Sequence, residues 1–472
     1  MRTDCVSDFV FILRWSVAGY VIRCFQNDLT TRKHKTFREL MGRVKYLYIL
    51  LIFLGVITSN PLRAQAPDTV AGIPVNYDES KVGQYVLPDP LILANGVKVE
   101  NAQTWYKERR PEILDLFKEF QYGHTPGPPA ELNYDVFDKG TRAFEGTAIR
   151  KQVRVYFSDD KDGPGMDLLI YLPANATAPA PVLMTPSFFP NSSRVDDPGV
   201  KRGEMWNRKH ERVPAPDNTG FGKLDVPLFI SHGIGIATVY YGDIQPDFAD
   251  GFKYGVIGLY HHEAEEGRKP DAWGAISAWA WGLSRAMDYF ERDQDIDSSR
   301  VALMGVSRIG KTVLWAAARD PRFAAVIGSC SGEGGAALSR RDFGETVAHL
   351  TAPSRYPYQF CQNYGTFAEH VDQLPVDGNL LLSLIVPRPV LLQTGSEDLW
   401  SDPKGEFLAA VDAGRVYRFL GRQGLETDQW PPAGELVSGT LSYYMHDGGH
   451  GTVPADWDIF LGFLQQHLFG KQ

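Results

Sequence analysis

Short apolar runs typical of buried strands alternate with segments of helical periodicity along most of this chain. The predicted helices cover residues 273–289, 309–318, 405–413 and 455–468. The predicted strands cover residues 149–157, 167–172, 181–185, 235–241, 300–305, 324–328, 389–394 and 441–445. Strands that are apolar on both faces need cover on both faces, and helices between parallel strands provide it. The alternation therefore predicts an α/β fold: a mostly parallel sheet with helices on both faces.

Composition excludes several classes of protein. The 472 residues are 43% hydrophobic and 22% charged, values typical of globular proteins and not of disordered or fibrous chains. The 48 basic and 57 acidic residues give a net charge of -9. Nucleic acids and anionic membranes need a basic surface, so we expect neither as a partner. The length allows one large enzyme domain with insertions or two smaller domains.

The N-terminal region has the layout of a targeting segment. After Met41, basic residues precede an apolar run over residues 46–58, and Ala64-Gln65-Ala66 is a small-residue cleavage pattern. Thirteen apolar residues are too few for a stable bilayer span, so a retained membrane helix is the weaker alternative. We expect a signal peptide over residues 41–66 that is cleaved after Ala66, with residues 1–40 a mis-assigned extension. The mature protein would be secreted or periplasmic, and not membrane-bound.

The remaining residues, 67–472, predict a single catalytic domain. Residues 67–145 are rich in turn signals with one helical stretch over 105–120, and form an N-terminal decoration. A polar stretch near 191–223 predicts a surface insertion. After cleavage only Cys330 and Cys361 remain, and an oxidising compartment would allow them to pair. Two buried thiols are an equally good reading of the sequence.

The most informative motif is RVALMGVSRIGKT at residues 300–312. An apolar strand runs to Gly305, Ser307 follows, and a helix begins directly afterwards. A serine on such a turn is a nucleophile elbow, whose strained backbone exposes the hydroxyl and requires small neighbours such as Gly305 and Gly310. The second glycine comes one residue later than the strict G-x-S-x-G pattern places it. An ordinary helix N-cap is the alternative role for Ser307.

In α/β-hydrolases the acid and the histidine follow the serine in chain order. The loop after residues 389–394 contains Glu397 and Asp398, and the loop after residues 441–445 contains His446 and His450. Both loops lie at the edge of the sheet where α/β proteins bind ligands. The base is therefore His450 or His446, with His450 favoured, and the acid is Asp398 or Glu397.

The sequence gives little support for a metal. His261, His262 and Glu263 are adjacent, but neighbours in sequence do not converge on one ion, and the H-E-x-x-H spacing is absent. We therefore expect no metal site.

The run from Gly305 to Lys311 resembles the G-C-S-R-x-G-K signature of the glucuronoyl esterases, a family of carbohydrate esterases. Further stretches resemble the bacterial branch of this family: LPDPLILANG at 87–96, WGAISAWAWGLSRAMDY at 273–289, CSGEGGAALSRR at 330–341 and QLPVDGNLLLSLIVPRP at 373–389. The resemblance implies an α/β-hydrolase without metal or organic cofactor. It also implies cleavage of esters between (4-O-methyl-)glucuronic acid on xylan and lignin alcohols.

The resemblance also implies roles for single residues. Ser307 would be the nucleophile, His450 the general base, and Arg308 would hold the oxyanion with its guanidinium. Lys311 would hydrogen-bond sugar hydroxyls, and Trp400 would stack on a pyranose ring. The sugar-contacting glutamine would be Gln359 or Gln362.

This chain departs from the fungal members of the family around the acid. They have a cysteine bridge at the positions of Val306 and Gly451, which is absent here. They also carry the catalytic Glu 23 residues after the serine, at the position of Cys330. Asp398 is therefore our first choice for the acid, and Glu333 the second. The rival functions are an acetylxylan or other carbohydrate esterase on the same fold, and an inactive xylan-binding module.

Overall fold

The computed structural model describes residues 68–129, 132–217, 222–260 and 267–470. The predicted extension and signal peptide over residues 1–66 lie outside the described residues, as do the adjacent His261, His262 and Glu263. Within the described ranges, no helix combines the length and apolar character that crossing a membrane requires. The fold described below is that of the unit over Ala66–Gln472.

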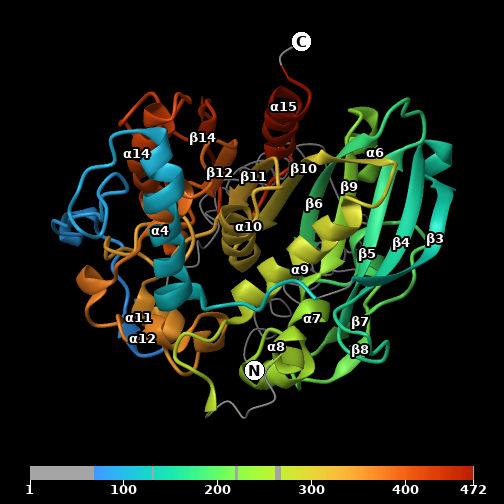
Figure 1. Cartoon of the computed structure of the whole chain (residues 1–472), viewed down its shortest axis with the longest axis horizontal. Helices are drawn as coiled ribbons and strands as arrows, with labels where there is room; N and C mark the ends of the chain where they lie inside the picture. Colours follow the sequence, from blue (N-terminus) through green and yellow to red (C-terminus); the bar gives the residue numbers. More distant parts are fainter. Residues whose placement is uncertain (1–67, 130–131, 218–221, 261–266, 471–472) are drawn as a thin grey trace, which may run out of the picture. The chain divides into compact units, whose positions relative to one another are not determined.

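A ten-stranded sheet runs through this unit in the order β13-β14-β12-β11-β10-β6-β9-β5-β4-β3. Six adjacent strands, β9, β6, β10, β11, β12 and β14, run parallel to one another (Figure 1). At one end of the sheet β5, β4 and β3 pair antiparallel, and at the other end β13 does. The strands of the sheet are β3 Asn133–Ala143, β4 Ala148–Tyr156, β5 Gly165–Pro173, β6 Ala180–Ser187, β9 Gly235–Tyr240, β10 Ile296–Val306, β11 Ala325–Ser329, β12 Val390–Gly395, β13 Leu436–Val437 and β14 Leu441–His446. The predicted mostly parallel sheet is confirmed.

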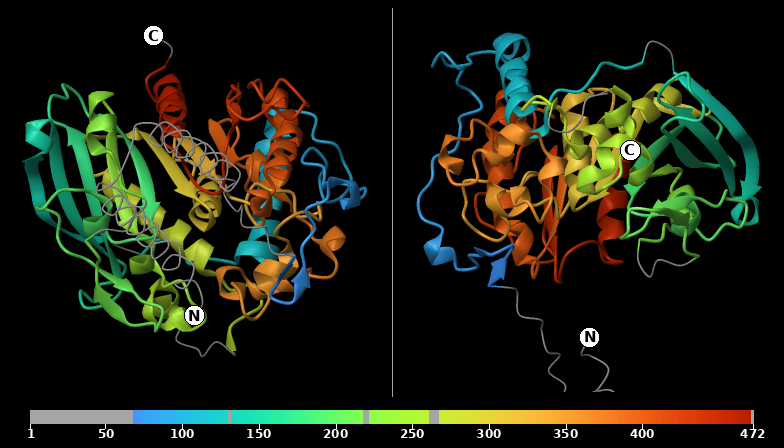
Figure 2. Two further views of the ribbon diagram at one scale, coloured as in Figure 1. Left: turned by 180° about the vertical axis from the view of Figure 1, so that it is seen from behind. Right: turned by 90° about the horizontal axis from the view of Figure 1, so that it is seen from below.

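Helices cover both faces of the sheet, as the alternation predicts. The helices are α3 Ala102–Thr104, α4 Arg110–Phe117, α5 Asn191–Arg194, α6 Val226–Ser231, α7 Tyr241–Ile244, α8 Val256–Tyr260, α9 Ala275–Phe290, α10 Arg308–Arg319, α11 Val347–Thr351, α12 Gln362–Gly365, α13 Gly378–Ser383, α14 Pro403–Phe419 and α15 Asp456–Leu468. Helices α9, α10 and α14 pack in one hydrophobic core, and α6 and α15 in a second. Figure 2 shows α4, in cyan, and α15, in dark red, on opposite sides of the sheet.

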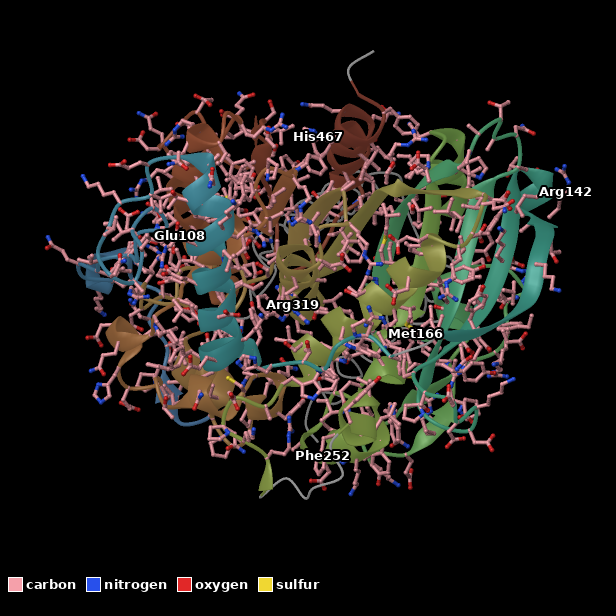
Figure 3. The ribbon with its side chains drawn as sticks, viewed as in Figure 1. Glu108, Arg142, Met166, Phe252, Arg319 and His467 are labelled. Atoms are coloured by element: carbon pink, nitrogen blue, oxygen red, sulfur yellow. The ribbon has the colours of Figure 1, made fainter. Side chains whose placement is uncertain are left out.

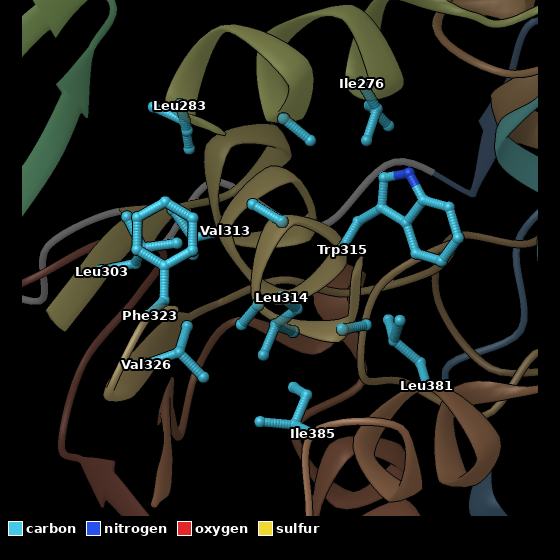
Figure 4. Packing of buried hydrophobic residues seen from close by; sticks show 14 of the residues in the cluster. Ile276, Leu283, Leu303, Val313, Leu314, Trp315, Phe323, Val326, Leu381 and Ile385 are labelled. Atoms are coloured by element: carbon cyan, nitrogen blue, oxygen red, sulfur yellow. The ribbon is translucent and has the colours of Figure 1, made fainter. Parts of the chain in front are cut away.

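Strand β10 shows why the central strands are apolar without alternation. Its residue Leu303 belongs to the first core, whereas its neighbours Ala302 and Met304 belong to the second. Successive side chains point to opposite faces, so a strand between two cores must be apolar at every position. Figure 4 shows the first core around Leu303, with Val313 of α10 and Leu283 of α9 packed near it.

Edge strand β3 lies inside the stretch 67–145 that the sequence assigns to decoration. It pairs antiparallel with β4 and alternates poorly, because most of its side chains are exposed. Figure 3 shows Arg142 of this strand at the outside of the molecule. The stretch near 191–223 contributes α5 and a separate two-stranded sheet, β7 Glu204–Trp206 with β8 Arg212–Pro214. A further two-stranded sheet, β1 Thr69–Val70 with β2 Ile73–Pro74, lies near the start of the described residues.

Candidate active site

Ser307 lies on the predicted strand-to-helix turn. It connects β10 to α10 with φ 61° and ψ −131°, a backbone conformation that residues other than glycine rarely adopt. The tight turn needs both glycines, since a Cβ on Gly305 would lie 2.5 Å from the Ile309 carbonyl oxygen and one on Gly310 would lie 2.8 Å from that of Ser329. Gly310, one residue later than the strict motif requires, therefore allows α10 to pack closely against the neighbouring strand β11. The geometry of a nucleophile elbow is present.

His450 and Asp398 are paired. Asp398 follows β12 and His450 follows the adjacent parallel strand β14, and the distance from His450 Nδ1 to Asp398 Oδ2 is 2.7 Å. The carboxylate is buried and the imidazole is 43% exposed. Ser401 Oγ lies 3.2 Å from the same ring nitrogen. Since these contacts use Nδ1, Nε2 is the nitrogen left to accept a proton from a nucleophile.

The serine and the histidine are linked across the sheet edge through β11. The backbone N–H of Ser307 donates to the Ser329 carbonyl at 2.9 Å, and Cys330, the next residue, contacts Gly451 beside His450. The loops that carry nucleophile, base and acid thus leave the same edge of the parallel strands. This arrangement can support acyl transfer.

The alternative base, His446, is not in contact with Asp398 but is held by other partners. This residue is buried, with Nδ1 2.9 Å from Asp456 Oδ2 and Nε2 2.9 Å from the Gly449 carbonyl oxygen. Both ring nitrogens therefore hold the loop between β14 and α15 in shape. The alternative acid Glu397 is an exposed residue whose backbone N–H donates to Gly448 at 2.7 Å.

Glu333 is held by hydrogen bonds of its own, and His450 is not among its partners. Its Oε1 accepts from Ser339 Oγ at 2.7 Å and from the Tyr364 hydroxyl at 2.6 Å. Burial raises the pKa of Glu333 to about 7, so this carboxyl is partly protonated near neutral pH. The structure places Asp398, and not Glu333, against His450.

Arg308 begins α10 directly after the nucleophile. Its guanidinium forms an ion pair with Asp247 and lies 4.6 Å from the centroid of the Tyr356 ring. Burial is the largest single effect and opposes the charge of Arg308, but the Asp247 carboxylate together with two nearby tyrosine hydroxyls raises the pKa of the guanidinium overall. Since a guanidinium has five N–H donors, it can still donate to an oxyanion while it is paired with Asp247.

Asp247 is a residue that the sequence reading missed. Besides Arg308, it accepts hydrogen bonds from the Tyr241 hydroxyl at 2.9 Å, the Tyr358 hydroxyl at 3.1 Å and Gln359 Nε2 at 2.7 Å. Gln359, predicted to contact sugar, is buried and donates to Asp247, whereas the alternative Gln362 is exposed. The sequence offered one indication of its role: Asp247 follows the parallel strand β9, at the edge of the sheet where α/β proteins bind ligands.

Lys311 and Trp400, both predicted to contact the sugar, have different surroundings. Lys311 lies one turn after Ser307 and is only 5% exposed, and burial lowers the pKa of its ammonium. Its Nζ donates no hydrogen bond to any residue in the described ranges. Trp400 borders a cleft of about 290 Å³ together with Tyr77, Arg355 and Asp398. A buried ammonium with unused donors and an aromatic face are groups that bind a sugar.

The predicted choice between a disulfide and two thiols is decided by the structure. Cys330 and Cys361 are both free and buried, so the disulfide alternative is wrong. Cys361 Sγ contacts the Glu119 carbonyl oxygen at 3.6 Å, and Cys330 Sγ accepts from the Gly451 N–H at 3.4 Å. The two sulfur atoms thus belong to different parts of the fold, and Cys330 borders the His450–Asp398 pair.

Glu406 makes stability depend on pH. One carboxylate oxygen accepts from Ser331 Oγ and the Gly332 N–H, the other has no partner in the described residues, and burial raises the pKa from 4.5 to about 8. Between these values the folded chain keeps a proton that the unfolded chain releases, so the free energy of unfolding falls as pH rises. We expect Glu406→Gln to flatten this fall between pH 5 and 8 in urea unfolding.

The control for this measurement is Glu426→Gln, since Glu426 is an exposed residue. It should follow the wild-type pH dependence. A Glu406→Gln curve parallel to the wild type would exclude Glu406 as a group that takes up a proton on folding.

Comparison with known sequences identifies relatives across most of the chain. The family model described as glucuronyl esterase of fungi matches residues 211–421. A carbohydrate esterase from an unknown prokaryotic organism is 43% identical over 404 residues, which cover 84% of this chain and 92% of that protein. A 4-O-methyl-glucuronoyl methylesterase of Wolfiporia cocos is 32% identical, over 80% of this chain and 82% of its own.

Solved structures agree with these relatives. The glucuronoyl esterase from Solibacter usitatus matches with a TM-score of 0.79 and 42% identity, covering 82% of this chain and 100% of its own. The glucuronoyl esterase from Teredinibacter turnerae matches with a TM-score of 0.70 and 31% identity, covering 88% and 97%. These similarities confirm the predicted fold and family: the chain belongs to the glucuronoyl esterases, carboxylic ester hydrolases of the α/β-hydrolase fold.

Proposed function

We propose that this enzyme hydrolyses esters of (4-O-methyl-)glucuronic acid on xylan with lignin alcohols, using Ser307, His450 and Asp398 as its triad. The observation that supports this proposal most is the 2.7 Å contact between His450 Nδ1 and Asp398 at the sheet edge that also carries the strained Ser307. The relative from Wolfiporia cocos is named a 4-O-methyl-glucuronoyl methylesterase, which agrees with a uronate ester as substrate.

The proposed reaction has two steps. Ser307 Oγ attacks the ester carbonyl while His450 Nε2 takes its proton, and Asp398 stabilises the imidazolium through Nδ1. The Arg308 guanidinium and backbone N–H hold the oxyanion, and the ion pair with Asp247 fixes the side chain in advance. His450 then protonates the leaving alcohol. Water, activated by His450, hydrolyses the glucuronoyl-enzyme and restores Ser307.

Two cations in this site favour a uronate over an acetyl ester. Arg308 faces the reacting carbonyl, and Lys311 follows one helical turn later, with its ammonium donors unused. An acetyl group has no hydroxyls for Lys311, whereas the acyl part of a glucuronate ester is a sugar ring that carries hydroxyls. The rival acetylxylan esterase would leave the buried ammonium without a partner, an unfavourable state for a buried charge.

The test is hydrolysis of benzyl glucuronate beside an acetyl ester of comparable alcohol, with the same enzyme preparation. We expect kcat/KM to be higher for the glucuronate. A preference for the acetyl ester would move the enzyme to the rival class. Binding of xylan without turnover of either ester would favour an inactive binding module.

Lys311 provides a sharper test of substrate recognition. Lys311→Met keeps an unbranched apolar stem and removes the ammonium, so KM for benzyl glucuronate should rise by about tenfold or more. KM for the acetyl ester should change by less than about twofold. Michaelis–Menten kinetics on both esters check this, with Lys107→Met as a matched variant of an exposed lysine. Equal effects on both esters would remove Lys311 from sugar recognition.

We also propose that the chain is exported and cleaved after Ala66, on the targeting pattern of residues 41–66. The N-terminal sequence of the protein from its native host should begin at Pro67. A native N-terminal peptide from residues 1–40 would contradict both the cleavage and the start at Met41.

A further inference from the structure

We propose that Cys330, Asp398 and His450 form an inhibitory site for Zn²⁺. One ligand atom from each residue lies within 4.8 Å of the other two. The three atoms are a sulfur, a carboxylate oxygen and an imidazole nitrogen, which are the ligand types that zinc prefers. The inhibition that this site would cause depends on the proposed triad, whereas binding of the metal does not.

The spacing suits a tetrahedral ion after small movements. Zinc bonds of about 2.3 Å to sulfur and about 2.0 Å to nitrogen and oxygen place these ligand atoms roughly 3.3 to 3.5 Å apart in a tetrahedral site. His450 Nδ1 and Asp398 Oδ2 are now 2.7 Å apart and need to separate slightly, and the sulfur lies within 4.8 Å of a ligand atom of each. The imidazole is 43% exposed, so an ion and a water as fourth ligand can enter from solvent.

The backbone holds the Cys330 sulfur in this position. Cys330 has φ 43°, its N–H donates to the Gln393 carbonyl at 2.7 Å, and the Gly451 N–H donates to its sulfur at 3.4 Å. Burial raises the pKa of the Cys330 thiol, so the metal itself must displace the proton. Zinc would displace the thiol proton to solvent, and the ion's two positive charges would be balanced by this thiolate and the Asp398 carboxylate.

Metal binding at this place would stop the proposed reaction through the tautomer of His450. Catalysis requires the proton on Nδ1 and a lone pair on Nε2 that accepts the proton of Ser307. With zinc on Nδ1, the proton of the neutral ring must be on Nε2. The ring could then no longer act as the base, and Asp398 would be occupied as a ligand. Zinc would therefore lower kcat reversibly without covalent change.

The direct test uses Co²⁺ as a spectroscopic substitute for zinc and needs no activity. Adding Co²⁺ to the enzyme should give a thiolate-to-cobalt charge-transfer band at one ion per chain, and Zn²⁺ should abolish it. Cys330→Ala and Cys330→Ser should both lack the band, while the matched variant Cys361→Ala, which removes the other buried thiol, should keep it. No band in the wild type, or a band that both Cys330 variants keep, would overturn the proposal.

Inhibition gives a second readout. Zn²⁺ should inhibit the wild type and Cys361→Ala, and a chelator should restore their activity, whereas Mg²⁺, which does not favour sulfur, should have no effect. For each variant the measure is the ratio of rates with and without zinc, and the zinc concentration for half-inhibition should rise at least tenfold in Cys330→Ala. Equal zinc sensitivity in all variants would refute the inhibitory site. A cobalt band without any esterase activity would refute the proposed function and leave the metal site standing.

Discussion

Ser307→Ala should lower kcat for benzyl glucuronate by between about 10³-fold and 10⁶-fold, the largest loss expected for any single substitution in this enzyme. The variant keeps the turn and the neighbouring contacts but removes the atom that forms the acyl bond. Arg308 and its backbone N–H remain, so residual turnover above the uncatalysed rate would come from oxyanion stabilisation and binding alone. Single-turnover kinetics should show no covalent intermediate.

A matched control separates this loss from damage to the fold. Ser354→Ala changes an exposed serine in the segment before Arg355 and should leave kcat within about twofold of the wild type. Thermal unfolding of both variants shows whether they fold. If a folded Ser307→Ala enzyme kept more than about a tenth of the activity, the nucleophile would have to be another residue.

The strands that can be predicted from the sequence are those that lie between the two hydrophobic cores. All eight predicted strands are present because their residues are buried on both faces, as Leu303 and its neighbours illustrate. Strand β3 was missed for the opposite reason. One of its faces is exposed at the sheet edge, its residues are of mixed polarity, and only pairing with β4 makes it a strand.

The candidate site was predictable where local sequence determines geometry. The glycines around Ser307 indicate the elbow, because few other sequences tolerate the turn. Choices that depend on contacts between distant segments were not predictable. His446 ends strand β14 and His450 follows four residues later, and only the structure shows that Asp398 contacts His450 while Asp456 contacts His446. Asp247 was missed because its four partners, Tyr241, Arg308, Tyr358 and Gln359, come from three separate segments of the chain.

Asp398→Asn and Glu333→Gln test which acid serves His450, and they should differ sharply. The amide at position 398 keeps the shape but can no longer hold the proton on Nδ1 or stabilise the imidazolium, so kcat should fall on the order of 10³-fold to 10⁴-fold. At position 333 the amide oxygen still accepts from Ser339 and Tyr364. Because the pKa of Glu333 is about 7, a neutral side chain there resembles the protonated acid, and kcat should fall by less than about tenfold.

For both variants kcat and KM are measured at the same pH, and each possible result identifies the acid. Asp398 sits 2.7 Å from the ring nitrogen, and Glu333 is tied to Tyr364, so the expected order follows from contacts that already exist in the resting enzyme. A near-total loss in Glu333→Gln with a mild loss in Asp398→Asn would reverse the assignment. It would require a rearrangement that frees Glu333 from both hydroxyls when substrate binds. Two comparable partial losses would mean that the negative charge facing the imidazolium is shared, since either acid alone then stabilises it only in part.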